Sequence, residues 1–117
     1  MKSLQELVKE FADTVMQQKA EMKSGTARAG NRFARKGARA WEELRSRGDE
    51  GREALAALFE DERPDVRAMA AACLLKYRTR DAKRVLKEVA QGEGLAAFGA
   101  SEALQRWKEG DWHLDPD

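Results

Sequence analysis

Cysteine, histidine and proline are scarce in this chain, which has one cysteine (Cys73), one histidine (His113) and two prolines in 117 residues. A single cysteine excludes an internal disulfide, and one cysteine with one histidine cannot complete a tetrahedral zinc site. A cysteine nucleophile would need the imidazole close by, but Cys73 lies in an apolar helical pattern and His113 in a terminal tail. These shortages predict a protein that is not an enzyme and that uses no metal or cofactor.

Long apolar runs are also missing. No segment approaches the roughly 18 apolar residues of a membrane-spanning helix, and the first residues are amphipathic instead of forming the apolar core of a secretory signal. The composition is 42% hydrophobic and 37% charged, which is typical of a folded, soluble domain. We therefore expect one monomeric, cytoplasmic domain over residues 1–117, with no membrane partner.

The residues that are abundant favour helices: alanine, leucine, arginine, lysine and glutamate. Apolar residues recur every three or four positions, Ser3 and Glu6 have the spacing of a capping box, and Pro64 suits the first turn of a helix. The pattern predicts an all-α fold of about six helices, near residues 3–22, 27–47, 50–60, 64–78, 81–91 and 95–109. An extended tail is expected at 111–117.

The second half of the chain contains an internal repeat. A shift of 30 residues places one mostly apolar set on another, namely Ala70, Cys73, Leu74, Lys76 and Tyr77 on Ala100, Ala103, Leu104, Arg106 and Trp107. The preceding helices match at a shift of 31. Helix pairs repeated at such an interval are typical of stacked α-solenoids, and Trp107 is expected in the core.

The string Asp61-x-x-Pro64-x-Val66-Arg67-x-x-Ala70-Ala71 resembles the HEAT repeat. The resemblance implies that Pro64 begins the second helix of a pair and that Asp61 and Arg67 tie neighbouring units together. Residues 92–97 reproduce none of these three, so no such tie is expected in the second copy. The implied fold is a short HEAT-like solenoid of two to three antiparallel helix pairs.

A further resemblance covers the chain from about Leu4 to Gly110. It is carried by four segments: Leu7-Val8-x-x-Phe11, Asn31-Arg32, Ala54-Leu55-x-x-Leu58-Phe59, and Gly99-Ala100-x-x-Ala103-Leu104-x-x-Trp107-x-x-Gly110. These segments are similar to those of a small bacterial HEAT-like family of unknown function. Single-domain members of such families look like immunity or inhibitor proteins encoded beside toxins. These motifs are mostly packing residues, so what they imply concerns the fold more than the chemistry.

Positive charge is concentrated on the second expected helix. Residues 19–47 hold nine basic and three acidic residues, a net charge of +6 in a chain whose total is +1. At about 100° per residue, one face of this helix gathers four arginines opposite Phe33, Gly37, Trp41 and Leu44. The candidate partner-binding residues are these arginines and a neighbouring lysine: Arg28, Arg32, Arg35, Lys36 and Arg39. This basic stripe is either a solvated helix face or a surface that docks on an acidic partner or on phosphates.

Trp112 follows the last expected helix and is a further candidate. It either folds back to seal the end of the array or stays exposed as an anchor for a partner. The sequence as a whole predicts a non-enzymatic protein-binding module, in particular a cytoplasmic immunity protein that neutralises a cognate toxin by direct binding. The alternatives are a nucleic-acid-binding module that uses the same stripe, and a scaffold or regulatory subunit. The low net charge and the lack of an exposed aromatic in the stripe argue against nucleic acid.

Overall fold

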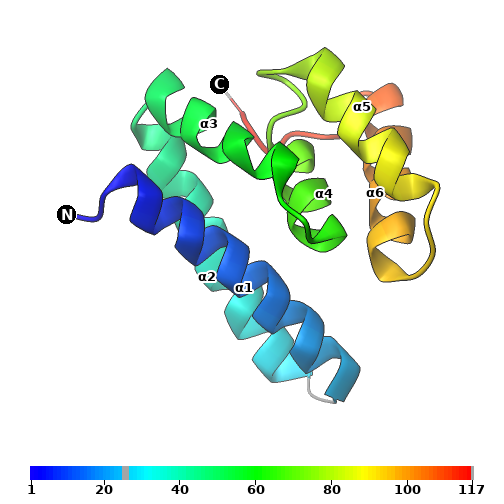
Figure 1. The fold of residues 1–117 in the computed structure, drawn as a ribbon, viewed down its shortest axis with the longest axis horizontal. Helices are drawn as coiled ribbons and strands as arrows, with labels where there is room; N and C mark the ends of the chain where they lie inside the picture. The colour runs from blue at the N-terminus through cyan, green and yellow to red at the C-terminus, as the bar shows by residue number, and fades with distance from the viewer. Residues whose placement is uncertain (25–26, 117) are drawn as a thin grey trace. The chain divides into compact units, whose positions relative to one another are not determined.

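The computed structural model describes the backbone of residues 1–24 and 27–116, and the side chains of residues 1–21 and 34–116. Within these residues all regular structure is helical, which confirms the all-α prediction (Figure 1). The elements are α1 (Leu4–Ser24), α2 (Ala27–Ser46), α3 (Asp49–Ala56), the 3-10 helix η1 (Ala57–Glu60), α4 (Pro64–Cys73), α5 (Thr79–Ala90) and α6 (Leu95–Lys108). No helix in the described part of the chain is both long enough and apolar enough to span a bilayer.

Two expected helices are shorter than their patterns indicated. The fourth ends at Cys73 instead of residue 78, and the last four residues of the third form η1. In each case neighbouring residues are buried together: Leu58 beside Phe59, and every residue from Ala70 to Leu75. Successive buried residues do not follow the single apolar stripe from which the longer helices were expected, and the chain turns at 74–77.

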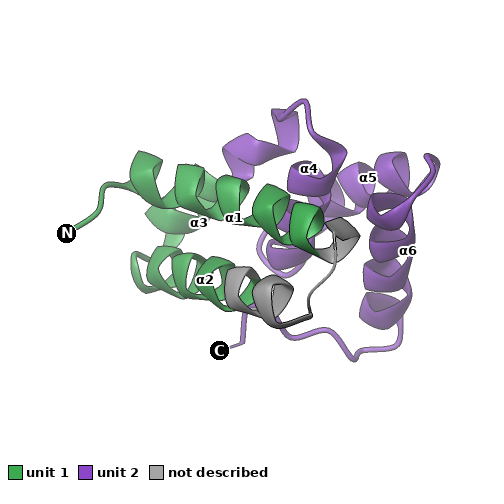
Figure 2. Ribbon diagram, turned by 90° about the horizontal axis from the view of Figure 1, so that it is seen from below, with its two compact units in different colours: residues 1–55 green, residues 56–117 purple. Residues whose placement is uncertain are grey.

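The chain forms two compact units, residues 1–55 and 56–117 (Figure 2). In the first, α1 and α2 run antiparallel side by side (Figure 1). The buried side chains of this unit include Leu7, Phe11, Trp41, Leu44 and Leu55. The helices approach closely at Gly37, where an added Cβ would lie 3.0 Å from the Thr14 hydroxyl oxygen. This is the close approach that a glycine in the apolar stripe of α2 allows.

The second unit holds η1, α4, α5 and α6, with α4 packed against both α5 and α6. Its largest fully buried side chains are Val66, Leu74, Leu75, Val85 and Leu86. Met69, an apolar residue of α4, is 38% exposed. Trp107, expected in the core, is half-buried.

The internal repeat is visible in burial but not in helix length. Ala70 and Ala100 are both buried, as are Cys73 and Ala103, so these equivalent positions face their cores alike. However, α4 stops at Cys73, whereas α6 continues past the equivalent residue to Lys108. The stacking of these pairs as a HEAT-like solenoid, and their union in a single domain, therefore stay predictions.

Candidate functional site

The outer side of α2 carries the described part of the predicted stripe. Arg35, Lys36 and Arg39 are exposed, while Trp41 and Leu44 on the other side of the helix are buried. We call these three cations the α2 basic face. The side chains of Arg28 and Arg32, which the sequence adds to this stripe, lie outside the described residues.

Carboxylates beside the α2 basic face are engaged with other cations. A hollow of about 410 Å³ runs between α1 and α2, and Glu10, Lys36, Arg39 and Glu43 are among the residues that line it. Glu10 pairs with Lys2, and Glu43 lies 3.5 Å from the Arg47 guanidinium. These two acids therefore pair with cations that lie outside the α2 basic face.

A second basic surface, which the sequence reasoning missed, lies on α5. Its cations are spaced i, i+3, i+4 and i+7 and line a hollow of about 410 Å³: Arg80, Lys83, Arg84 and Lys87. We call this set the α5 basic face. It lies opposite the buried stripe of Ala82, Val85, Leu86 and Val89. Asp81 and Glu88 lie 3.9 and 3.7 Å from Arg84, so this face is partly neutralised. The spacing of the cations alone could have identified it.

The proline turn agrees with the HEAT resemblance at Pro64, and the tie between neighbouring units that Asp61 and Arg67 would make stays a prediction. Pro64 begins α4, as expected. The Asp61 carboxylate accepts hydrogen bonds from Arg63: 2.9 Å from the backbone N, 2.9 Å from Nε and 3.0 Å from Nη2. The Arg63 side chain is the main cause of a lowered Asp61 pKa. Arg67 also lowers the Asp61 pKa, through a smaller electrostatic effect.

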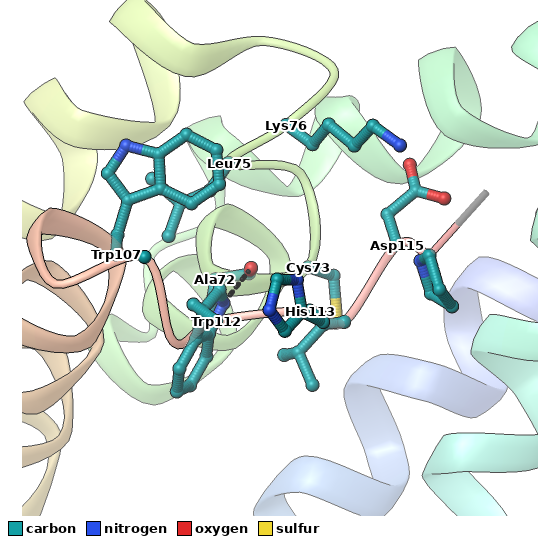
Figure 3. A pocket seen from close by; sticks show the side chains of 11 residues that line it. Ala72, Cys73, Leu75, Lys76, Trp107, Trp112, His113 and Asp115 are labelled. Carbon is teal, nitrogen blue, oxygen red and sulfur yellow. Dashed lines mark hydrogen bonds between the residues drawn. The ribbon is translucent and has the colours of Figure 1, made fainter.

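The C-terminal tail folds back onto the end of α4 (Figure 3). The half-buried Trp112 donates a hydrogen bond of 2.8 Å from its indole Nε1 to the Ala72 carbonyl oxygen. The sequence left open whether Trp112 folds back or stays exposed as an anchor, and in the structure it folds back. A pocket of about 490 Å³ lies between the tail and the α4 end, and we call it the tail pocket. Its lining includes Ala72, Leu75, Lys76, Trp107, Trp112 and Asp115.

Cys73 and His113 both line the tail pocket but do not make a nucleophilic pair. Cys73 is buried, and burial together with the nearby Asp115 carboxylate raises the pKa of its thiol to about 12. The thiol is therefore neutral at physiological pH, whereas a nucleophile must be a thiolate. His113 is exposed to solvent. No cluster of three or more potential metal ligands occurs among the described side chains.

Comparison with known proteins identifies a family without assigning a chemistry. Residues 5–106 match the model of a family described as a domain of unknown function (DUF2019). No curated protein and no solved structure matches the chain. This agrees with the expected membership of an unknown-function family, and it leaves function to be argued from the surfaces themselves.

Proposed function

The chain belongs to the DUF2019 family of unknown function, and we propose that it is a non-enzymatic module that binds an acidic protein partner through the α2 basic face. The observation that carries this proposal is the exposure of Arg35, Lys36 and Arg39 on one side of a helix whose other side is buried. The buried side fixes the helix, so the cations are presented from a rigid element. Preorganisation of this kind lowers the entropy that binding costs.

Arginine suits such a surface better than lysine. Its planar guanidinium can bind a carboxylate through two parallel hydrogen bonds, so Arg35 and Arg39 can recognise both the charge and the geometry of an acidic partner. A positive surface of this kind also steers an acidic partner into encounter and raises the association rate. The neutral, buried Cys73 thiol supports a binding role over a catalytic one, because it removes the one cysteine nucleophile of the chain.

The specific form of the proposal is a cytoplasmic immunity-type protein that neutralises a cognate toxin by covering it. The resemblance to single-domain HEAT-like families supports this form. The α2 basic face would bind a toxin whose functional surface is acidic. Scaffold or regulatory roles would use the same face with a different partner.

The experiment begins with co-purification of the full chain from its native host and identification of the retained protein by mass spectrometry. The binding of that purified protein is then compared for wild type, Arg35→Glu/Arg39→Glu, and the control Lys83→Glu/Lys87→Glu. The control makes the same change of charge at the same i, i+4 spacing, but on the α5 basic face. We expect the α2 variant to bind at least about tenfold more weakly and the control to bind as wild type. Equal affinities for all three would reject the α2 basic face as the binding surface.

A second candidate function is binding of nucleic acid, and the α5 basic face is the observation that favours it. Four cations on one helix face could follow a phosphate backbone. The logarithm of the affinity of such binding falls linearly with the logarithm of the salt concentration. In this case the binding of DNA or RNA, measured by an electrophoretic mobility shift, should depend steeply on salt and should be lost in the Lys83→Glu/Lys87→Glu variant. A packed protein interface should show a much weaker salt dependence.

A further inference from the structure

We propose that the chain pairs with a second copy of itself through the outer side of α6. This surface is separate from the α2 basic face, so the proposal does not rest on the function argued above. It departs from the monomer that the sequence predicts. We call the surface the α6 face and define it by residues that are all exposed: Glu93, Leu95, Phe98, Gly99, Glu102 and Arg106.

The centre of the α6 face is apolar and lies outside the core. Phe98 is 66% exposed and Leu95 is 56% exposed, the largest fractions among the large apolar side chains that the structure describes, after the terminal Met1. Because they are three positions apart, the two side chains adjoin on one turn of the helix. Single exposed apolar residues are common on protein surfaces, but two neighbours form a surface that gains free energy when a partner covers it.

Gly99 makes this surface suited to another helix. An added Cβ at Gly99 would meet no atom within 4 Å, so the helix has an open notch beside the apolar pair. No contact within the described chain uses the missing side chain, although glycine lowers helix stability at such a position. A second helix can approach closest at a glycine, and Leu95 and Phe98 would then pack beside the crossing point.

The charges at the two ends of the α6 face favour a copy of α6 as that second helix. Glu93 lies six positions before Gly99, and Arg106 lies seven positions after it. Neither side chain has an ion pair or a side-chain hydrogen bond within the part of the chain that the structure describes. If two copies of α6 cross antiparallel at Gly99, a two-fold axis passes near this residue. Arg106 of each copy then lies opposite Glu93 of the other, and two ion pairs close the ends.

The size of the apolar centre predicts a weak dimer. Two large apolar side chains from each copy cover far less than the roughly 1,200–2,000 Å² that stable complexes bury. Glu102 lies about one helical turn from Gly99, so its carboxylate approaches that of the partner copy and opposes pairing. We therefore expect a dissociation constant on the order of 0.1 mM.

Sedimentation equilibrium of the full chain, at concentrations up to about 1 mM, tests the dimer. Phe98→Gln and Gly99→Gln should each weaken it at least about fivefold, and Glu102→Gln should tighten it. Ser101→Gln is the matched control, because Ser101 is also exposed on α6 but lies about 200° around the helix from Gly99. It should dimerise as wild type, and urea unfolding verifies that each variant is folded. A wild-type chain that stays monomeric at about 1 mM would overturn the proposal, as would equal effects of Gly99→Gln and Ser101→Gln.

Exchange of charges tests the antiparallel arrangement. Glu93→Arg and Arg106→Glu should each weaken the dimer about fivefold, because like charges then meet at both ends. An equimolar mixture of the two variants should associate about as tightly as wild type, since each end again joins opposite charges. Glu93 and Arg106 lie at opposite ends of α6, so a contact within one chain cannot produce this rescue. A mixture as weak as the separate variants would overturn the arrangement.

The Arg35→Glu/Arg39→Glu variant separates this dimer from the proposed function. It changes only the α2 basic face, so it should dimerise as wild type even where it no longer binds the acidic partner. Loss of the dimer in this variant would show that the α2 basic face takes part in self-association, which contradicts pairing through α6 alone.

Discussion

The indole N–H of Trp112 donates to the Ala72 carbonyl at 2.8 Å, and this bond joins residues 40 positions apart. It ties a tail without regular structure to the last turn of α4. The tail therefore closes the end of the second unit and forms one wall of the tail pocket. Terminal elements of helical arrays commonly need such a cover over their apolar side chains.

The Trp112 bond predicts a measurable loss of stability when only the N–H is removed. Trp112→Phe keeps an aromatic ring but leaves the Ala72 carbonyl without this donor, so the free energy of unfolding should fall by about 1–2 kcal/mol. Urea unfolding followed by far-UV circular dichroism measures it. His113→Ala, at an exposed neighbouring position, should change the stability by less than about 0.5 kcal/mol. Equal effects of the two substitutions would show that the bond does not stabilise the fold.

The lowered pKa of Asp61 predicts how the free energy of unfolding depends on pH. Its pKa is lowered from the ordinary value of 3.8, chiefly by the Arg63 hydrogen bonds, so the folded protein favours the ionised carboxylate. This contribution is present above pH 3.8, the pKa of the unfolded chain, and is lost as the pH falls through the lower folded pKa. Asp61→Asn should therefore destabilise the protein at pH 7, and by progressively less as the pH falls below 3.8, measured by urea unfolding. Glu62→Gln, an exposed neighbour, should show no such difference.

Arg63 and Arg67 should respond differently to substitution because their guanidinium groups have different partners. The Nε of Arg67 is buried and has no hydrogen-bond partner among the described residues. Arg67→Met keeps most of the apolar stem and removes this cost, so the stability should stay equal or rise slightly. Arg63→Met removes the bonds to Asp61 and should cost about 0.5–1 kcal/mol, a modest value because the Arg63 side chain is 42% exposed. A larger loss of stability for Arg67→Met than for Arg63→Met in urea unfolding would contradict this prediction.

Local sequence signals predicted the helices well because their causes lie within one turn. The Ser3 and Glu6 capping box is present in both directions, at 3.1 and 3.2 Å, and Pro64 begins α4. The outer side of α2 follows from periodicity alone, as the exposure of Arg35 and Arg39 shows. These features need no knowledge of which elements meet in space.

Features that depend on distant contacts could not be read in the same way. Six successive residues are buried around the end of α4, and their spacing does not reveal which neighbours cover them. The acceptor of the Trp112 bond lies 40 residues away, on a backbone carbonyl that carries no sequence signal. The bonds from the Arg63 guanidinium to Asp61 likewise depend on how the proline turn folds, which spacing alone does not indicate.

Two glycines predict opposite outcomes for the same substitution. An added Cβ at Gly51 would lie 1.8 Å from the Leu44 carbonyl oxygen, so Gly51→Ala must displace backbone and should cost more than about 2 kcal/mol. Gly99, in α6, has open space around it, and Gly99→Ala should stabilise the protein by about 0.4–1 kcal/mol. Thermal and urea unfolding of both variants measure the difference. A stable Gly51→Ala protein would show that α3 can move away from the end of α2.

Because Cys73 is buried and neutral, we expect its thiol to react with a labelling reagent only when the protein unfolds. Its pKa is raised from 9.0 to about 12, which lowers the thiolate fraction at pH 8 about a thousandfold, and its side chain is buried. Labelling by an aromatic disulfide reagent should therefore be slow and should accelerate with urea in parallel with unfolding. Ser101→Cys in a Cys73→Ala background places a thiol at an exposed position of α6 and should react rapidly without urea.

Because the folded pKa is the higher one, the protonated thiol also contributes stability below pH 9 that is lost as the pH rises toward 12. Cys73→Ala should remove this alkaline dependence of the free energy of unfolding. In the labelling experiment, a native Cys73 that reacts as fast as the thiol of the Ser101→Cys protein would contradict a buried, neutral thiol.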